Sequence, residues 1–146
     1  MTYAVYYEMS NGDKVNQYLF APASKLESTA LVPILWYREL SKTTPNRGFT
    51  RIARDDYKPL VGEADIDTLL SHEMSQFEGL STYMRGPLAD PSYEVQVVFP
   101  VLLTDTIKYD ILQNHNNGRN QVPADLLAQI RVQRSEYTLP KLPGES

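Results

Sequence analysis

Residues 2–21 read TYAVYYEMSNGDKVNQYLFA, and this segment sets the architecture of the chain. Two β-prone segments, residues 2–10 and 15–21, are rich in tyrosine, valine, phenylalanine and leucine, and Asn11-Gly12-Asp13 lies between them. An Asn-Gly pair between such segments predicts a β-hairpin, because both residues tolerate a positive φ at little cost.

The two faces of this hairpin both carry aromatic rings. Side chains alternate between the faces of a strand, so Tyr3, Val5 and Tyr7 share one face, whereas Tyr6 and Glu8 share the other. We expect one face to meet the core and the other to be covered or to contact a partner.

Three later segments predict helices. Residues 24–27 have the spacing of a capping box, and apolar residues continue at helical spacing to Leu40. A helix over residues 26–40, bent at Pro33, is therefore favoured, with a strand over residues 31–37 as the competing interpretation. A second helix is predicted from about residue 65 to 85 by its apolar periodicity. The third helix begins at Pro123 and ends near Arg134, with Leu126, Leu127 and Ile130 inward.

Two further strands are predicted. Residues 49–53 suit a short strand, and residues 93–103 suit a longer one. The longer one is nearly continuously apolar toward its end, which favours a central position, and Pro100 requires a bulge or a bend. Residues 104–113 either continue this strand or begin a short helix capped by Thr104, and residues 114–120 are expected to form a loop.

These elements predict a single α+β domain over residues 1–136, followed by an extended or frayed tail over residues 137–146. The sheet is expected to be mainly antiparallel with three to five strands, and three or four helices are expected to pack largely on one face. A length of 146 residues with 42% hydrophobic and 22% charged residues suits one globular domain.

The composition excludes several classes of protein. Acidic residues number 18 against 14 lysines and arginines, so generic nucleic-acid binding is disfavoured, since it requires a surplus of cations. Without cysteine the chain has no disulfides, thiolate metal sites or cysteine nucleophiles. No secretory signal and no apolar run of about 20 residues is visible. We therefore expect a soluble, cytoplasmic protein without membrane attachment.

One candidate site is a cluster of basic residues. Arg47, Arg51, Arg54 and Lys58 lie close together in an otherwise acidic chain. Guanidinium groups bind phosphate and carboxylate groups bidentately, so this cluster suits a nucleotide, another phosphorylated ligand or an acidic partner. The alternative is a solvated surface whose charges pair with neighbouring carboxylates.

A second candidate is the loop over residues 114–120, which is dense in asparagine. His115 and Arg119 within it suit the reading of a polar ligand, although asparagine and glycine are also common turn residues. A ligand pocket built from both candidates would bring Arg47, Arg51, Arg54, His115 and Arg119 together.

The usual catalytic and metal-binding motifs are incomplete. His72-Glu73 begins a zincin-like motif, but Gln76 stands where the second histidine is required. Carboxylates at Asp55, Asp56, Glu63, Asp65 and Asp67 suit a hard cation, yet helix capping and solvation explain them adequately. No phosphate-binding loop or dinucleotide fingerprint is present. We therefore expect no metal, no cofactor and, on balance, no enzyme.

Tyrosine is the remaining signal. The chain contains ten, and Tyr3, Tyr6, Tyr7 and Tyr18 crowd the hairpin. Tyrosine is enriched in protein interfaces, and it is also a good strand residue.

The expected function is a non-enzymatic protein-binding module, a small acidic adaptor or inhibitor of a larger complex, acting through this aromatic hairpin. Its partner would be another protein or a second copy of the chain. One alternative is a protein that binds or hydrolyses a small phosphorylated ligand in an arginine-rich pocket. Another alternative is a structural subunit of a larger assembly.

Overall fold

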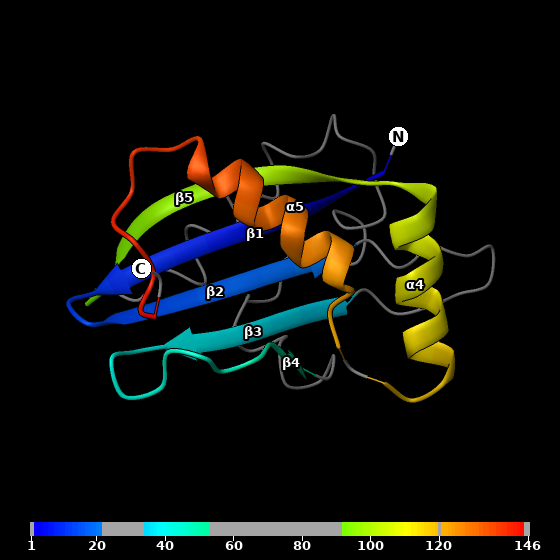
Figure 1. The fold of residues 1–146 in the computed structure, drawn as a ribbon, viewed down its shortest axis with the longest axis horizontal. Coiled ribbons are helices and arrows are strands. Elements are labelled where there is room, and N and C mark those ends of the chain that lie inside the picture. The colour runs from blue at the N-terminus through cyan, green and yellow to red at the C-terminus, as the bar shows by residue number, and fades with distance from the viewer. Residues whose placement is uncertain (1, 22–33, 53–91, 120, 145–146) are drawn as a thin grey trace.

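The computed structural model describes residues 2–21, 34–52, 92–119 and 121–144. This part of the chain is α+β, as expected. Five strands form one antiparallel sheet in the order β4-β3-β2-β1-β5. Helix α5 crosses one face of the sheet, and α4 stands at the end of the strands where β5 leads into it (Figure 1). The expectation of a mainly antiparallel sheet is thereby confirmed.

The N-terminal hairpin is confirmed. Strands β1 (Thr2–Asn11) and β2 (Lys14–Ala21) pair antiparallel, with Asn11 opposite Lys14. The turn between them is therefore Gly12-Asp13, and Gly12 alone has a positive φ, of 56°. Glycine at the first central position is the arrangement that lets a two-residue turn follow the twist of the strands.

The prediction of a bent helix over residues 26–40 is wrong for residues 34–40. Ile34–Leu40 form strand β3, which pairs with β2 on one side and with β4 (Thr50–Ile52) on the other. The competing strand interpretation was the better one, and the short strand expected at residues 49–53 is confirmed. Residues 22–33, including the capping box, lie outside the described part.

Strand β5 (Glu94–Leu103) is confirmed as a strand but not as a central one. It pairs with β1 only and forms an edge among the described strands. Pro100 stays in register opposite Val5, because an edge strand tolerates the missing N–H. The irregularity in register instead falls between Glu8 and Met9 of β1, which pair with Val97 and Val95.

Two helices follow β5. Residues 105–116 form α4 (Asp105–Asn116), so the helical alternative holds for residues 104–113, and the Ile107 amide donates to Thr104 Oγ1 over 3.2 Å. The helix predicted from Pro123 to about Arg134 is confirmed as α5 (Ala124–Ser135), in which Pro123 is the N-cap rather than the first helical residue. The described residues contain two helices where three or four were expected for the chain. The helix predicted over residues 65–85 lies outside the described residues.

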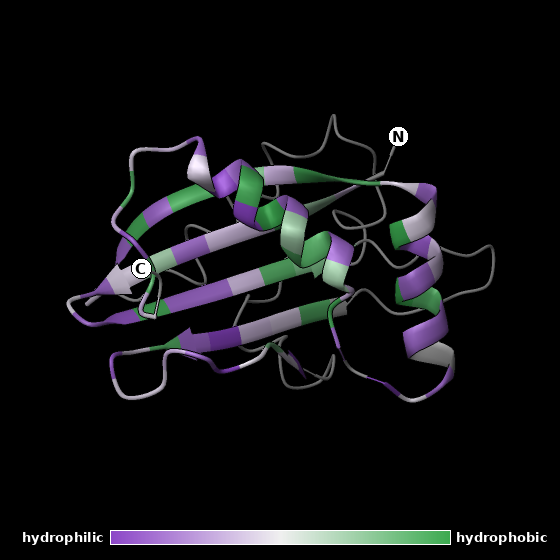
Figure 2. Cartoon of the chain, in the orientation of Figure 1, coloured by the Kyte–Doolittle hydropathy of each residue, from purple (hydrophilic) through white to green (hydrophobic). Residues whose placement is uncertain are grey.

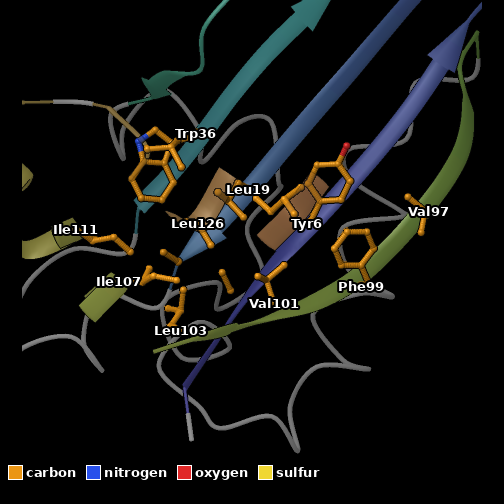
Figure 3. Packing of buried hydrophobic residues seen from close by; sticks show 14 residues of the cluster. Tyr6, Leu19, Trp36, Val97, Phe99, Val101, Leu103, Ile107, Ile111 and Leu126 are labelled. Carbon is orange, nitrogen blue, oxygen red and sulfur yellow. The ribbon is translucent and has the colours of Figure 1, made fainter. Parts of the chain in front are cut away.

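The main core fills the space between the sheet and these two helices (Figure 3). Tyr6, Phe99 and Trp36 contribute its rings, and the ring centroids of Tyr6 and Phe99 are 4.9 Å apart. The helices add Ile107 and Ile111 from α4, and Leu126 and Ile130 from α5. Side chains on the opposite face of the sheet are buried too: Val5, Tyr7, Met9, Tyr18, Phe20 and Leu35.

No helix among the described residues is long and apolar enough to cross a membrane.

Candidate functional site: a basic cleft above a buried polar row

A row of polar side chains crosses the core face of the sheet. Glu8 on β1 is opposite Gln17 on β2, which is opposite Arg38 on β3, so all three share one face. The neighbouring row on the same face is Tyr6, Leu19 and Trp36, which belongs to the core. Hydrophilic colour on β2 and β3 gathers toward the hairpin turn, and hydrophobic colour toward the other end (Figure 2).

Glu8 and Arg134 form a buried, bidentate ion pair. Arg134 Nε donates to Glu8 Oε1 and Arg134 Nη2 to Glu8 Oε2, each over 2.7 Å. The side chains of Glu8 and Arg134 are only 1% and 11% exposed. Arg134 reaches the sheet because it shares the buried face of α5 with Leu126 and Ile130. This pair therefore joins the C-terminal turn of α5 to strand β1 of the sheet.

The remaining acceptor capacity of Glu8 is also used. Gln17 Nε2 donates to Glu8 Oε1 over 3.2 Å, and the Tyr6 hydroxyl donates to the same oxygen. A carboxylate offers about four acceptor positions, and a buried charge is tolerated only when it is paired and hydrogen-bonded. Burial, followed by the neighbouring Glu8 charge, raises the pKa of Tyr6 well above its ordinary value of 10.0. Tyr6 thus acts as a permanent hydrogen-bond donor.

Arg38 ends this polar row, and three of its contacts lie within the described part of the chain. Its Nε donates to Gln17 Oε1, its Nη1 donates to the Arg47 carbonyl oxygen over 3.3 Å, and its guanidinium lies 4.3 Å from the ring centroid of Phe49. A guanidinium fixed in this way loses little side-chain entropy when it binds a ligand, so it is preorganised for recognition.

Arg47 and Phe49 belong to the β3–β4 loop, residues 41–49. The loop starts with a tight turn in which Ser41 and Thr44 exchange backbone hydrogen bonds of 3.3 and 3.1 Å. This turn reverses the chain after β3, so that residues 45–49 run back past Arg38.

A cleft of about 830 Å³ opens above the polar row. Its walls come from the β3–β4 loop, from α5 and from the C-terminal segment, which we define as residues 137–144. We call it the basic cleft, because no described lining residue is acidic and five are cationic. These five are Arg38, Arg47, Arg131, Arg134 and Lys141. A cleft with this lining attracts anions although the whole chain has a net charge of −4.

The five cations fall into two groups. Arg38 and Arg134 are engaged in the polar row. Arg47, Arg131 and Lys141 are exposed on the rim, and no ion pair joins them to any carboxylate in the described part of the chain. The rim cations are therefore available to a ligand, with Arg38 fixed beside them.

The arginine and histidine residues expected to form one pocket do not come together as a set. Arg47 lines the basic cleft. Arg51 stands opposite Trp36 on β4, on the sheet face that carries Arg38, but it does not line the cleft. Arg54 and Lys58 lie outside the described residues.

The loop expected over residues 114–120 is wrong for its first three residues, which belong to α4. His115 falls within α4, which extends to Asn116, and its side chain is outside the described part. Arg119 lines a separate cavity of about 330 Å³ together with Asp110 and Asp125. This second cavity lies near the start of α5, whereas the basic cleft lies near its end.

The tyrosines of the hairpin are packed against other side chains rather than exposed to solvent. Tyr6, Tyr7 and Tyr18 are buried, and Tyr3 is half-buried. The Tyr18 ring lies between those of Tyr7 and Tyr37 in tilted contacts, with ring centroids 6.0 and 4.9 Å away. The described structure therefore offers these rings little open surface for a partner.

Four of the five cleft cations were not anticipated: Arg38, Arg131, Arg134 and Lys141. The sequence carries a signal for one of them, Arg134, and none for the other three. Glu8 follows Ala4 and Tyr6 on a core face, and Arg134 follows Leu126 and Ile130 on the inward face of a helix. A charge on each of two core-facing surfaces indicates a buried ion pair, since an unpaired buried charge is prohibitively costly.

Comparisons of this chain with protein-family models, with curated proteins and with solved structures find no match. Among the residues that the structure describes, no cluster of three or more histidine and carboxylate side chains is arranged to hold a metal ion. The basic cleft is the candidate site that the geometry of the described residues supports.

Proposed function

We propose that this protein binds a small phosphorylated ligand, such as a nucleotide or a sugar phosphate, in the basic cleft. The observation that carries the proposal is the charge of the lining: five cations and no carboxylate among the described lining residues, in a chain with more acidic than basic residues. Such segregation of charge suits an anionic ligand and does not suit a solvated surface, where both signs are mixed.

The placement of the cations supports a phosphate. Arg47 comes from the β3–β4 loop, Arg131 from α5 and Lys141 from the C-terminal segment, so they approach the cleft from different walls. Arg38 contributes a guanidinium already fixed by Gln17 and Phe49. Arginine forks match the oxygen geometry of phosphate, and charge-assisted hydrogen bonds are about twice as strong as neutral ones.

The size and the apolar part of the cleft support an organic body on the ligand. A volume of about 830 Å³ far exceeds the need of inorganic phosphate and falls in the range of about 300–1,000 Å³ typical of ligand pockets. Phe49, Leu127, Leu139 and Leu142 line it as well, all partly buried. A base or sugar ring can rest on these side chains while its phosphates meet the rim.

The test is a binding series on purified protein. Thermal shift and calorimetry are measured with inorganic phosphate, pyrophosphate, ADP, ATP and a hexose phosphate, for wild type, Arg47→Gln and Arg131→Gln. Since a hydrogen bond to a charged group contributes about 1.5–3 kcal/mol, each substitution is expected to weaken binding by roughly 10- to 100-fold. Affinity is also expected to fall with added salt, because the rim charges are exposed.

Arg119→Gln is the matched control, because it removes the same charge from an exposed arginine outside the basic cleft. Its ligand affinity is expected to equal that of wild type. The proposal fails if no phosphorylated compound raises the melting temperature of wild type, or if Arg119→Gln loses as much affinity as Arg131→Gln.

A further inference from the structure

The C-terminal segment is built into the wall of the basic cleft. Lys141, Leu142, Pro143 and Gly144 line the cleft, and Gly144 approaches the β3–β4 loop. The approach is close: a Cβ added to Gly144 would lie 2.9 Å from Pro45 Cβ. Figure 1 shows the segment leaving the end of α5 and crossing toward the loop that follows β3. The segment thus spans from the helix to the loop that carries Arg47.

Two apolar anchors attach its first half to the core. The Tyr137 ring stacks on Phe99, with centroids 5.6 Å apart and planes inclined by 12°. Leu139 packs against the main core cluster. These contacts fix the start of the segment to β5 and to the face of the sheet under α5.

Arg134 adds a polar anchor at Pro140. Its Nη2 donates both to Glu8 Oε2 over 2.7 Å and to the Pro140 carbonyl oxygen over 3.1 Å. One nitrogen therefore links a buried carboxylate of β1 to the backbone of the C-terminal segment. Lys141, the next residue, lines the cleft.

We infer that the C-terminal segment is a strap of the ligand site, that the Glu8–Arg134 pair positions this strap, and that Lys141 is the cation it brings to the ligand. This inference rests on the proposed function. A phosphorylated ligand that contacts Lys141 together with Arg47 or Arg131 links the strap to the loop or to the helix. The ligand then holds the strap in place, and release of the strap speeds dissociation of the ligand.

The attachment of the strap is tested first, without ligand. Trypsin cleaves after Lys141, and hydrogen exchange reports the amides of residues 137–144. Arg134→Lys keeps the positive charge but loses the fork that joins Glu8 and Pro140, so cleavage at Lys141 and exchange in this segment are expected to accelerate about tenfold or more. Exchange in β1 and β2 reports whether the sheet stays folded.

Two further variants complete this test. Tyr137→Ala removes an anchor that is 43% exposed, leaves the buried ion pair intact and is expected to accelerate the same cleavage. Arg119→Lys is the control and is expected to behave as wild type. Equal cleavage rates in wild type, Arg134→Lys and Tyr137→Ala would overturn the idea that the segment is fastened.

The role of Lys141 is tested with ATP and pyrophosphate as probes. Lys141→Gln is expected to weaken binding about tenfold, mostly through faster dissociation, and Lys141→Arg is expected to restore it. If Arg131→Gln weakens binding while Lys141→Gln and Arg134→Lys do not, the strap is refuted and the proposed function stands. If wild type binds neither probe nor any other ligand of the series, the proposed function and the role of Lys141 are both refuted. The cleavage rates measured without ligand still decide whether the C-terminal segment is fastened.

Discussion

Replacing Glu8 by glutamine tests the central role of the buried ion pair. The substitution preserves the size of the side chain and one acceptor oxygen, but it leaves the guanidinium of Arg134 buried without a counter-charge. Breaking a buried pair by neutralising one partner costs about 3–5 kcal/mol. Because Glu8 also accepts from Tyr6 and Gln17, and glutamine keeps part of that capacity, we expect the lower end, about 3 kcal/mol.

This loss is a large share of the stability of a domain, which is typically about 5–15 kcal/mol. For a chain of 146 residues it corresponds to a fall in melting temperature of roughly 10 °C. In urea the midpoint is expected to fall by roughly 1–3 M, since the dependence of unfolding free energy on urea is about 1–3 kcal/mol per molar for small proteins.

The assay is equilibrium unfolding in urea followed by tryptophan fluorescence. Trp36 is the single tryptophan of the chain and is only 2% exposed, in the core row adjacent to Glu8, Gln17 and Arg38. Its emission therefore reports the loss of the same core that the ion pair crosses. The slope of the transition shows whether folding stays two-state in the variant.

The double variant Glu8→Gln with Arg134→Met is the decisive comparison. Removing the second charge relieves the penalty of an unpaired guanidinium, so the double variant is expected to be more stable than Glu8→Gln alone. The reasoning is refuted if Glu8→Gln lies within about 1 kcal/mol of wild type, or if adding Arg134→Met destabilises it further by the full cost of that substitution in the wild-type background.

Three further predictions follow from single groups. Burial and the Glu8 charge raise the pKa of Tyr6 well above 10.0, so the stabilisation that the Tyr6 hydroxyl provides is complete below pH 10 and falls as the pH rises further. The urea midpoint of Tyr6→Phe is therefore expected to fall less between about pH 10 and 11 than the midpoint of wild type. Equal falls in the two proteins would contradict this. Thr104→Ala removes the side-chain acceptor for the Ile107 amide and is expected to cost about 1 kcal/mol in urea unfolding, with Thr104→Ser as the variant that restores it. Gly12→Ala forces a side chain onto a φ of 56° and is expected to cost about 1 kcal/mol, whereas Asp13→Ala, in the same turn but without positive φ, tests whether that cost comes from backbone strain.

Local patterns were sufficient for several elements of this protein. Asn11-Gly12-Asp13 between two β-prone segments predicted the hairpin, and Pro123 followed by Leu126 and Ile130 predicted α5. In each case the signal lies within a few residues, because turn geometry, helix capping and side-chain periodicity act over that range.

Strand β3 shows where local patterns were insufficient. The apolar residues of residues 26–40 fit helical spacing, yet Ile34–Leu40 pair with β2 and β4. Hydrogen bonding to two neighbouring strands and burial of Trp36 and Leu35 stabilise the extended backbone. These contributions depend on residues elsewhere in the chain. The edge position of β5 likewise depends on which strand it meets.

Sequence by itself determined the hairpin, the short β4, the strand character of β5, and α5. Tertiary structure alone decided that Glu8 meets Arg134, 126 residues later, and that Arg38, Arg47, Arg131 and Lys141 gather around one cleft. The physical reason is the distance along the sequence over which each interaction acts. Backbone preferences are set by neighbours in sequence, whereas the pairing of buried charges and the shape of a cleft arise only when the sheet, α5 and the C-terminal segment pack together.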